Sequence, residues 1–301
     1  MERNNKGGGI RKKQEKQGIS QRKQKAFFFT TLLVLMFALI YNFLGFRQEL
    51  ALGENYIMVT FLDVGQGESI LLRSNAHAVL IDGGEHRYRQ VILDYLHLSD
   101  VRHIDYVIAT HPHSDHIGGL ITVLSSVSVG QVVMPDVTHN TTTFDNFVSV
   151  IENRAIPIRI AHAGDSIQAG IINLKVLAPY GTQARLNDMS VVVRMEHGQT
   201  SFLFTGDAES ASERQMVSSG MNLSSNVLNV GHHGSRTSTT EIFLNAVSPD
   251  IAVISLGRNN QFGHPHHEVM ERLQSQNITI LRTDELGTIQ MITNGYVIAI
   301  V

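Results

Sequence analysis

Short runs of β-branched and other apolar residues recur along the chain from residue 57 onward, and Gly, Asp or His closes most of them. Apolar runs of about 4–8 residues between turn-forming residues predict β-strands. The ranges that we predict as strands are 58–62, 69–72, 78–81, 106–108, 201–204, 227–230, 251–254, 278–281, 287–292 and 297–300. We interpret the early runs as strands of a half-buried sheet.

Apolar residues at helical spacing occur between many of these strands. The predicted helices are 89–97, 117–126, 144–153, 209–219, 241–247 and 268–276. Strands and helices come in a mixed order rather than in strict alternation. Two sheets packed face to face with helices outside accommodate these elements, because every sheet and helix must cover its apolar face. The pattern therefore predicts a mixed α/β (α+β) fold.

The first 46 residues follow a different pattern. Residues 1–25 contain nine Lys and Arg but only two Glu, and residues 26–46 form an uncharged, mostly apolar run. A membrane helix needs about 20 apolar residues. We therefore predict a basic cytoplasmic tail at 1–25 and a transmembrane anchor at 26–46. No convincing small-residue cleavage site follows, which favours an uncleaved anchor over a cleaved secretory signal.

The predicted anchor also gives an orientation. Basic residues that precede a membrane helix stay on the cytoplasmic side. We expect a single-pass protein of the cell membrane, with a cytoplasmic N-terminus and the rest of the chain extracytoplasmic. Residues 47–56 are predicted as a short linker and residues 57–301 as one domain, because mixed units of about 250 residues often fold as one piece.

The amino-acid composition excludes several kinds of site. The chain has no Cys, which excludes disulfides, thiolate nucleophiles and Cys-ligated zinc. Residues 26–301 carry 15 Lys and Arg against 25 Asp and Glu, a formal charge of about −10, and Lys175 is their one lysine. An acidic domain lacks the diffuse positive field that attracts nucleic acid. A polyanion would need a local patch, which the arginines or bound metal ions can supply.

Four metal-ligand side chains, His111, His113, Asp115 and His116, stand within six positions just after the strand predicted at 106–108. In an extended loop His111 and His113 point the same way, whereas Asp115 and His116, at a turn, are directed toward a second centre. A solvated histidine-rich loop is the alternative, but the end of a buried strand is an unusual place for one. The spacing predicts a hydrolytic site with two metal ions.

Two further carboxylates follow predicted strands. Asp82 comes after the strand 78–81 and before two glycines, and Asp207 comes shortly after the strand 201–204. Either aspartate can instead be an ordinary turn residue. As a site residue, Asp207 has the position of a carboxylate that bridges two cations.

Histidines follow two later strands. His232 and His233 are adjacent, so in an extended chain they cannot face the same way. One is expected to bind metal while its neighbour orients substrate or supports the site, and the sequence leaves open which. His264 lies in a Gly-His-Pro context that suits a fixed ligand, whereas His266 and His267 are expected to begin the next helix on its surface.

The ordered set of motifs resembles the metallo-β-lactamase superfamily, and within it the metal-binding domain at the C-terminus of ComEC-type competence DNA-uptake proteins. The resemblance covers about residues 57–301. Its motifs are 61–69, 81–84, 110–120, 187–190, 206–209, 231–235 and 263–265. Any one motif is weak evidence, whereas the set in this order is specific. The resemblance implies a four-layer αββα sandwich with the site at one edge, here preceded by the predicted transmembrane helix.

The resemblance also implies two divalent metal ions, and His and Asp ligands without thiolate suit zinc or manganese. The implied ligands are His111 and His113 for one ion, Asp115 and His116 for the other, Asp207 as the bridge, and His232 or His233 with His264 to complete the shells. The catalytic candidates are Asp115, Asp207 and His233. We expect Asp207 to accept a proton from water, and His232 or His233 to stabilise charge on a phosphoryl oxygen.

The chain departs from the wider superfamily before the bridging aspartate. True β-lactamases carry another histidine there, and His197 lies too far along the next strand to be an easy substitute for it. ComEC-like domains share the pattern that this chain has instead, so the departure argues against antibiotic hydrolysis rather than against metal binding. Candidates for substrate contact or for supporting the ligands are Asp82, Asn187, Asp188, Ser190 and Ser235.

We expect hydrolysis of a polyanionic phosphodiester, with DNA as the leading substrate, because two metal ions can hold both oxygens of an in-line displacement. One alternative is an esterase for a cell-envelope phosphodiester of the choline or teichoic-acid type. The chain has no Trp and seven Tyr, so an aromatic choline cage has little support. The other alternative is a non-catalytic, metal-stabilised module of an uptake or envelope complex. With a single predicted anchor, the chain cannot itself form a membrane channel.

Overall fold

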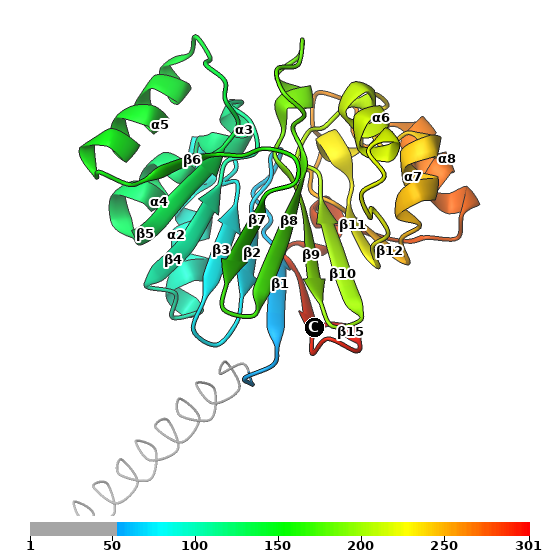
Figure 1. Cartoon of the computed structure of the whole chain (residues 1–301), viewed down its shortest axis with the longest axis horizontal. Helices are drawn as coiled ribbons and strands as arrows, with labels where there is room; N and C mark the ends of the chain where they lie inside the picture. Colours follow the sequence, from blue (N-terminus) through cyan, green and yellow to red (C-terminus); the bar gives the residue numbers. More distant parts are fainter. Residues whose placement is uncertain (1–52) are drawn as a thin grey trace, which may run out of the picture. The chain divides into compact units, whose positions relative to one another are not determined.

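Two mixed β-sheets form the centre of residues 53–301, which are the residues that the computed structural model describes (Figure 1). The eight-stranded sheet has the order β15-β14-β1-β2-β3-β4-β5-β6. Its strands are β1 (Ile57–Phe61), β2 (Ile70–Arg73), β3 (Ala78–Ile81), β4 (His103–Ile108), β5 (Ser128–Met134), β6 (Ile158–Ile160), β14 (Ile289–Thr293) and β15 (Ile298–Ile300).

The seven-stranded sheet has the order β13-β12-β11-β10-β9-β8-β7. Its strands are β7 (Ser166–Ala169), β8 (Ile172–Ala178), β9 (Val192–His197), β10 (Thr200–Phe204), β11 (Val227–Asn229), β12 (Ile251–Ile254) and β13 (Thr279–Arg282). The strands predicted from the sequence recur here within a few residues. The predicted ranges do not include β5 to β8, and for β9 the sequence analysis names only a strand that reaches His197. Exposed polar or glycine positions interrupt the apolar pattern in β5, β7 and β8, and β6 has only three residues.

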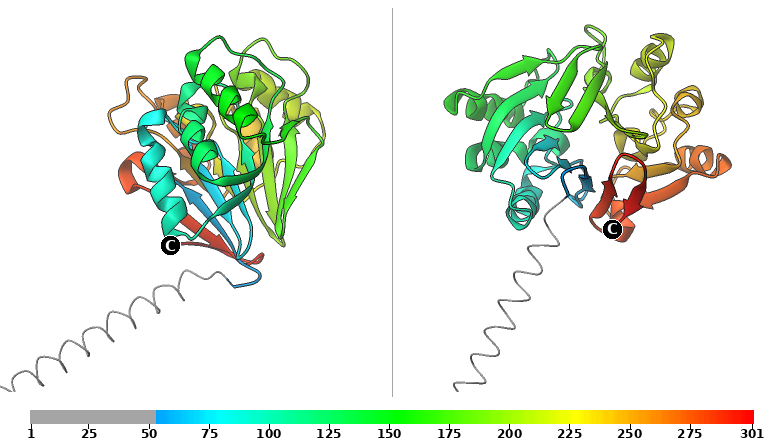
Figure 2. Two further views of the ribbon diagram at one scale, coloured as in Figure 1. Left: turned by 90° about the vertical axis from the view of Figure 1, so that its left-hand side faces the viewer. Right: turned by 60° about the horizontal axis from the view of Figure 1, so that its bottom comes forward.

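Helices cover the outer face of each sheet (Figures 1 and 2). The eight-stranded sheet carries α2 (Arg89–Leu98), α4 (Leu120–Ser126) and α5 (Thr142–Asn153), and the seven-stranded sheet carries α6 (Ser210–Ser218), α7 (Glu241–Val247) and α8 (His267–Ser275). Shorter helices are α3 (Ser114–Ile117) and α9 (Thr283–Leu286). The described residues therefore form the predicted αββα layers. The predicted tail, the predicted anchor and the first part of the predicted linker fall within residues 1–52, which are outside the described residues.

The core between the sheets is largely apolar, and ring centroids of Phe61 in β1 and Phe204 in β10 lie 6.2 Å apart across it. Outer-facing residues are also covered, because helices lie on that side. Every residue of β3 is buried, as is every residue of β10. The expectation of a half-buried sheet is therefore wrong for the central strands, whose continuous apolar runs are typical of a sheet covered on both faces.

The predicted helix at 117–126 starts only at Leu120, as α4, and Gly118 and Gly119 separate it from α3, which ends at Ile117. A Cβ on Gly119 would lie 2.0 Å from the carbonyl oxygen of Gly83, so only glycine permits this approach of the two backbones. The approach brings α3 and its side chains against the loop that follows β3. None of the helices in the described part of the chain is long and apolar enough to span a membrane.

Strand directions place the predicted site residues together. β3 runs parallel to β4, and β10 runs parallel to β11. In such parallel pairs the carboxyl ends lie at the same edge, which is where ligands bind in α/β sheets. The loops after these four strands carry Asp82, His111, Asp207 and His232 respectively. Residues that are more than 100 positions apart in the sequence thus meet at one edge of the two sheets.

Candidate metal centre

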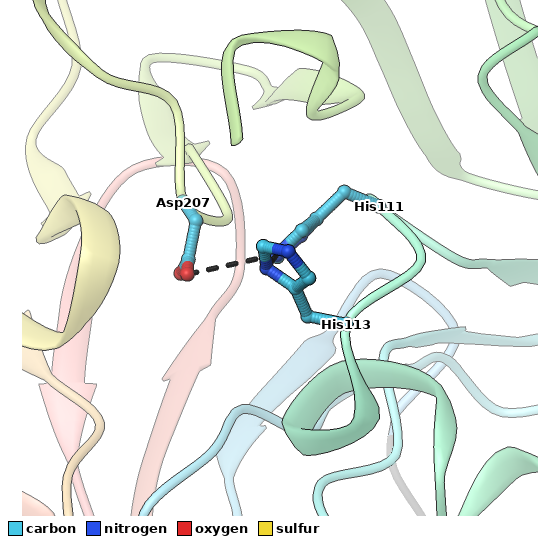
Figure 3. Close-up of side chains that lie close together, drawn as sticks. All are labelled: His111, His113 and Asp207. Atoms are coloured by element: carbon cyan, nitrogen blue, oxygen red, sulfur yellow. Dashed lines mark hydrogen bonds and ion pairs between the residues drawn. The ribbon is translucent and has the colours of Figure 1, made fainter. Parts of the chain in front are cut away.

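His111, His113 and Asp207 form the first cluster, and their ligand atoms lie within 4.8 Å of one another. Figure 3 shows both imidazoles, on the loop after β4, beside the carboxylate on the loop after β10. His111 Nε2 is 3.6 Å from Asp207 Oδ2 and 2.9 Å from His113 Nδ1. The two rings that the sequence pattern directs to one side therefore do share one centre.

Asp115, His116 and His233 form the second cluster, again within 4.8 Å of one another. His233 Nε2 lies 3.4 Å from Asp115 Oδ2, and His116 Nε2 lies 3.9 Å from the same oxygen. Asp115 and His116 belong to the short helix α3, and the two clusters adjoin, because the ring centroids of His116 and His111 lie 4.1 Å apart. The predicted division of the 111–116 segment between two centres agrees with this geometry.

Asp207 stands between the clusters and presents one oxygen to each. Oδ2 faces His111, whereas Oδ1 lies 3.2 Å from His116 Nε2 and 3.6 Å from His233 Nε2. The carboxylate is almost completely buried. Its backbone N–H donates to Ser190 Oγ at 3.2 Å, which holds the turn after β10 in place. Asp207 thus has the position of a bridging ligand.

Three buried atoms on the second side, His116 Nε2, Asp207 Oδ1 and His233 Nε2, have no hydrogen-bond partner among the described residues. Buried polar atoms are nearly always bonded, and an exception needs a chemical reason. These three converge, with separations of 3.2 and 3.6 Å from the aspartate oxygen to the two nitrogens. A divalent ion would satisfy all three, so imidazole and carboxylate donors here fit zinc or manganese.

Electrostatics distinguish the two clusters. Burial lowers the pKa of His116 and His233, but Asp207 and neighbouring carboxylates outweigh it. The pKa of His116 is raised well above its usual value and that of His233 to about 9. Burial and the charge of His116 hold the pKa of His111 well below its usual value. Burial opposes ionisation of Asp207, yet the histidines around it keep its pKa well below the usual range.

Asp82 supports the second cluster from behind. Its Oδ2 lies 2.6 Å from His116 Nδ1, and its two oxygens accept hydrogen bonds from the N–H and the hydroxyl of Thr110 at 2.8 and 2.6 Å. A carboxylate on one ring nitrogen fixes the ring and directs the other nitrogen to a metal. Asp82 therefore has the supporting position that was one of its two predicted roles.

Glu68 is a site residue that the sequence reasoning missed. Together with Asp82 and His116 it forms a third buried cluster, and Asn229 donates a hydrogen bond to its carboxylate. Burial, followed by the charge of Asp82, raises the pKa of Glu68 to about 7. The available signal was its place in the 61–69 motif, but nothing in the local pattern separates it from a surface glutamate.

His232 and His233 lie in the 3₁₀ turn Gly231–Gly234, and both have left-handed backbone angles, with φ of 51° and 54°. Each such residue costs about 1–2 kcal/mol. The turn directs both rings to Asp207, with His232 Nε2 3.6 Å from Oδ2 and His233 Nε2 3.6 Å from Oδ1. The reasoning that adjacent histidines diverge applies to an extended chain, and this chain is not extended there.

The segment 187–190 contains no histidine and holds its neighbours in place. Asn187 Nδ2 lies 3.4 Å from His232 Nδ1 and 3.3 Å from Glu209 Oε1. Asp188 Oδ1 accepts hydrogen bonds from backbone N–H groups at the start of α6, at 3.2 and 3.0 Å. Ser190 holds the backbone of Asp207, as described above. The predicted roles of this segment were substrate contact and support of the ligands, and these contacts correspond to support.

Glu209 is a second residue that the sequence reasoning did not single out. Its Oε1 lies 3.3 Å from His232 Nδ1, and Arg185 pairs with its other oxygen at 2.9 Å. The carboxylate therefore holds the outer nitrogen of His232 and leaves Nε2 toward Asp207. Its position in the motif 206–209 was a signal, although a glutamate before a helix is also common without any site.

His264 and Ser235 lie in neither cluster. His264 lines the same open pocket of about 190 Å³ as Asp207 and His232, and its Nδ1 is 3.5 Å from Gln66 Nε2. Burial and neighbouring histidines lower its pKa to about 4. Ser235 Oγ instead lies 3.0 Å from the hydroxyl of Thr237. As expected, His266 and His267 begin α8, His266 as its N-cap and His267 as its exposed first residue.

A family model described as the metallo-beta-lactamase superfamily matches residues 62–258. The chain is 32% identical over 251 residues to ComE operon protein 3 of Bacillus subtilis, covering 77% of this chain and 32% of the relative. It is 34% identical over 257 residues to competence protein ComA of Neisseria gonorrhoeae, covering 84% and 34%. The chain therefore spans about a third of the length of these relatives.

Among solved structures, the fold is similar to that of Igni18, a metallo hydrolase from the archaeon Ignicoccus hospitalis. The sequences are 11% identical, the TM-score is 0.53, and the match covers 78% of this chain and 98% of the other. Likeness at this identity concerns the fold alone. With the paired His/Asp clusters and the αββα layers, these similarities establish that the chain belongs to the metallo-β-lactamase superfamily, as a relative of the ComEC-type competence proteins.

Proposed function

We propose that this protein is a dinuclear metal-dependent hydrolase of phosphodiesters. The observation that carries the proposal is the buried Asp207, which presents one carboxylate oxygen to each of two His/Asp clusters. The chemistry that two bound divalent ions supply is water with its pKa lowered to about 7 and positive charge beside the phosphoryl oxygens. No cysteine is available as a nucleophile, and the proposed reaction requires no protein nucleophile.

We assign the ligands by side of Asp207. Asp115, His116, His233 and Oδ1 of Asp207, whose atoms converge, would hold the second ion. His111, His113 and Oδ2 of Asp207 would hold the first ion. His232 completes the first set, because its Nε2 faces the same Oδ2 while Glu209 and Asn187 hold its Nδ1. It thereby replaces the histidine that this chain lacks in the segment 187–190.

The proton of the attacking water goes to Asp115 in this proposal. Both oxygens of Asp207 face metal ligands, and its side chain is 3% exposed, whereas that of Asp115 is 27% exposed toward the open pocket. This burial favours Asp115 over Asp207, to which the sequence analysis gave the role. Gln66 and His264 also line the pocket, where they can donate hydrogen bonds to a phosphoryl oxygen.

The setting that we propose follows from the relatives' names and from residues 1–46. Two relatives are a ComE operon protein and a competence protein, which supports DNA as the substrate and a role beside an uptake or envelope complex. The uncharged run 26–46 after a basic tail supports a single-pass anchor in the cell membrane, with the catalytic domain outside the cytoplasm. Zinc and manganese are equally supported as the metal.

The test is hydrolysis by the full chain in detergent, with zinc or manganese, of a generic diester such as bis(4-nitrophenyl) phosphate and of DNA. Metal content is measured on the same preparations. We expect two ions per chain and cleavage that is lost in Asp207→Asn. Two ions without cleavage of any diester would contradict the proposal and favour a non-catalytic module. Cleavage of a teichoic-acid polymer but not of DNA would mean that the substrate is a polymer of the cell envelope.

A further inference from the structure

A large cleft opens beside the metal centre. Its volume is about 910 Å³, and its walls come from the loop after β1, the segment before α2 and the loop after β12. Gln66 and Phe262 line both this cleft and the 190 Å³ pocket, which is also lined by five of the seven proposed metal ligands. The two openings therefore adjoin, and a polymer cleaved at the metal centre has space to continue into the cleft.

Phe262 stands at the junction of the two openings. The side chain is a large apolar group that is 53% exposed, and its ring stacks on His264 with centroids 5.6 Å apart and planes 27° apart. The imidazole behind it holds the phenyl ring at a defined angle. A flat aromatic face that remains open to solvent beside a polar site is suited to stacking with a planar group of the substrate.

Arg258 provides the positive charge of the cleft. Its guanidinium donates to the carbonyl oxygen of Asp284 from Nε and NH2, at 3.1 and 2.9 Å, and makes no ion pair with a carboxylate within residues 53–301. Arg87, across the cleft, pairs with Glu85 at 2.8 Å and lies over the ring of Tyr88. The backbone contact therefore fixes Arg258 while leaving its charge uncompensated.

Two of the three acidic side chains of the cleft are paired with arginines, whereas Asp63 makes no ion pair within residues 53–301. Glu85 is paired with Arg87, and Asp284 is paired with Arg282 at 2.7 Å. Asp63 accepts a hydrogen bond from the backbone N–H of Gly65 at 3.1 Å. The cleft thus combines an uncompensated arginine with an open aromatic face, which is the kind of local patch that an acidic domain needs in order to bind a polyanion.

We propose that this cleft binds an unpaired nucleic-acid strand next to the scissile phosphate, with one base stacked on Phe262 and a backbone phosphate at Arg258. The inference rests on the proposed phosphodiesterase function and selects its substrate class. A paired base already has both faces covered by its neighbours in the duplex, so Phe262 requires an unpaired one. Polyol-phosphate polymers of the cell envelope carry phosphate but no planar base for this ring.

The first test is binding, measured by fluorescence anisotropy with the full chain in detergent and without added metal. The probes are a labelled oligothymidylate and an abasic oligonucleotide of the same length. We expect oligothymidylate to bind more tightly, and Phe262→Leu, which keeps an apolar side chain but removes the ring, to weaken its binding about tenfold. Tyr296→Leu is the matched control, because Tyr296 is a 71% exposed aromatic residue in the distant β14–β15 turn.

The second test concerns the charge. Arg258→Gln should lower the slope of log K against log salt by about 0.7 for the single strand, which corresponds to one lost phosphate contact. Arg258→Lys should restore most of that slope. Arg102→Gln is the control, since Arg102 is an 84% exposed arginine at the start of β4, away from the cleft.

The outcomes separate this inference from the proposed function. Equal binding of the thymidine and abasic strands, or unchanged binding by Phe262→Leu and Arg258→Gln, would overturn the cleft assignment even if the protein hydrolyses a generic diester. Tighter competition by a polyglycerol-phosphate polymer than by oligothymidylate would also overturn it. Base-dependent binding without hydrolysis of any diester would instead reject the phosphodiesterase function and retain the cleft as a nucleic-acid site.

Discussion

The two halves of the metal centre are built differently. The half made by Asp115, His116 and His233 has converging buried atoms without partners, and Asp82 holds its histidine from behind. In the other half, His111 Nε2 and His113 Nδ1 lie 2.9 Å apart in a hydrogen bond with each other. That bond must break before both nitrogens can bind one ion. The first (His111/His113) half therefore has to lose the hydrogen shared by its two nitrogens, whereas the second (Asp115/His116/His233) half already has unpartnered atoms that converge.

The pKa values of the histidines also differ between the two halves. Carboxylates raise the pKa values of His116 and His233, while burial keeps those of His111 and His113 low. The second half thus concentrates negative charge that a cation can neutralise. We expect it to bind its ion more tightly, and the first half to exchange its ion more readily.

The largest expected effect comes from removing the group that the halves share. Asp207→Asn keeps the shape of the side chain but removes the negative charge between the clusters. We expect fewer than two ions per chain and a loss of hydrolysis of at least about a thousandfold, since both proposed ions lose a ligand. Metal analysis and kinetics measure this. Asp94→Asn, at an exposed carboxylate on α2, is the control; equal losses in both variants would point to general instability.

The adjacent histidines allow a direct comparison of the halves. His233→Gln should release the ion of the second half and His232→Gln only that of the first, each with an affinity loss above about 100-fold, because loss of a supporting group alone costs 10–100-fold. A calorimetric titration with the metal ion measures the affinity of each of the two sites. If His232→Gln keeps two tightly bound ions and loses only turnover, His232 acts on the substrate instead.

Supporting carboxylates should have smaller effects. Asp82→Asn weakens the hold on His116 and is expected to lower the affinity of the second half about 10–100-fold. Glu209→Gln is expected to lower that of the first half about tenfold, since Asn187 and Thr237 also contact the same nitrogen of His232. Competition with a chelator measures both affinities. Unchanged affinity in Asp82→Asn would mean that Thr110 and packing suffice to orient the ring.

The smallest expected effect is on proton release. In the metal-free protein, His233 with its pKa of about 9 and His116 with its raised pKa carry protons at pH 7, which the second ion must displace. Its affinity therefore falls as the pH is lowered. His111 and His113, with lowered pKa values, are already neutral at pH 7, so the first ion displaces few protons there. Calorimetry in buffers of different ionisation enthalpy counts the protons released by each ion. Similar counts for both ions would contradict the proposed electrostatic difference between the two halves.

The sequence by itself determined the features that depend only on neighbouring residues, such as the bounds of strands and the spacing of the His/Asp segment. The candidate ligands His111, His113, Asp115 and His116 come from one short segment, so their spacing predicts the division between two clusters that the structure has. Likewise, β3, β12 and α7 have the bounds that their apolar patterns predict. Where polar residues interrupt that pattern, as in β5 and β8, local periodicity is too weak to mark the strand.

Only the tertiary structure decided which groups come together in each His/Asp cluster. The left-handed turn at His232 and His233 brings both rings to Asp207, although adjacent residues diverge in an extended chain. Glu68 and Glu209 look like surface glutamates in sequence, yet they are buried beside metal ligands. These positions depend on the order of strands and on contacts between distant loops. Local patterns encode which face of a strand is buried, but the identity of the neighbour across it is set by packing of the whole domain.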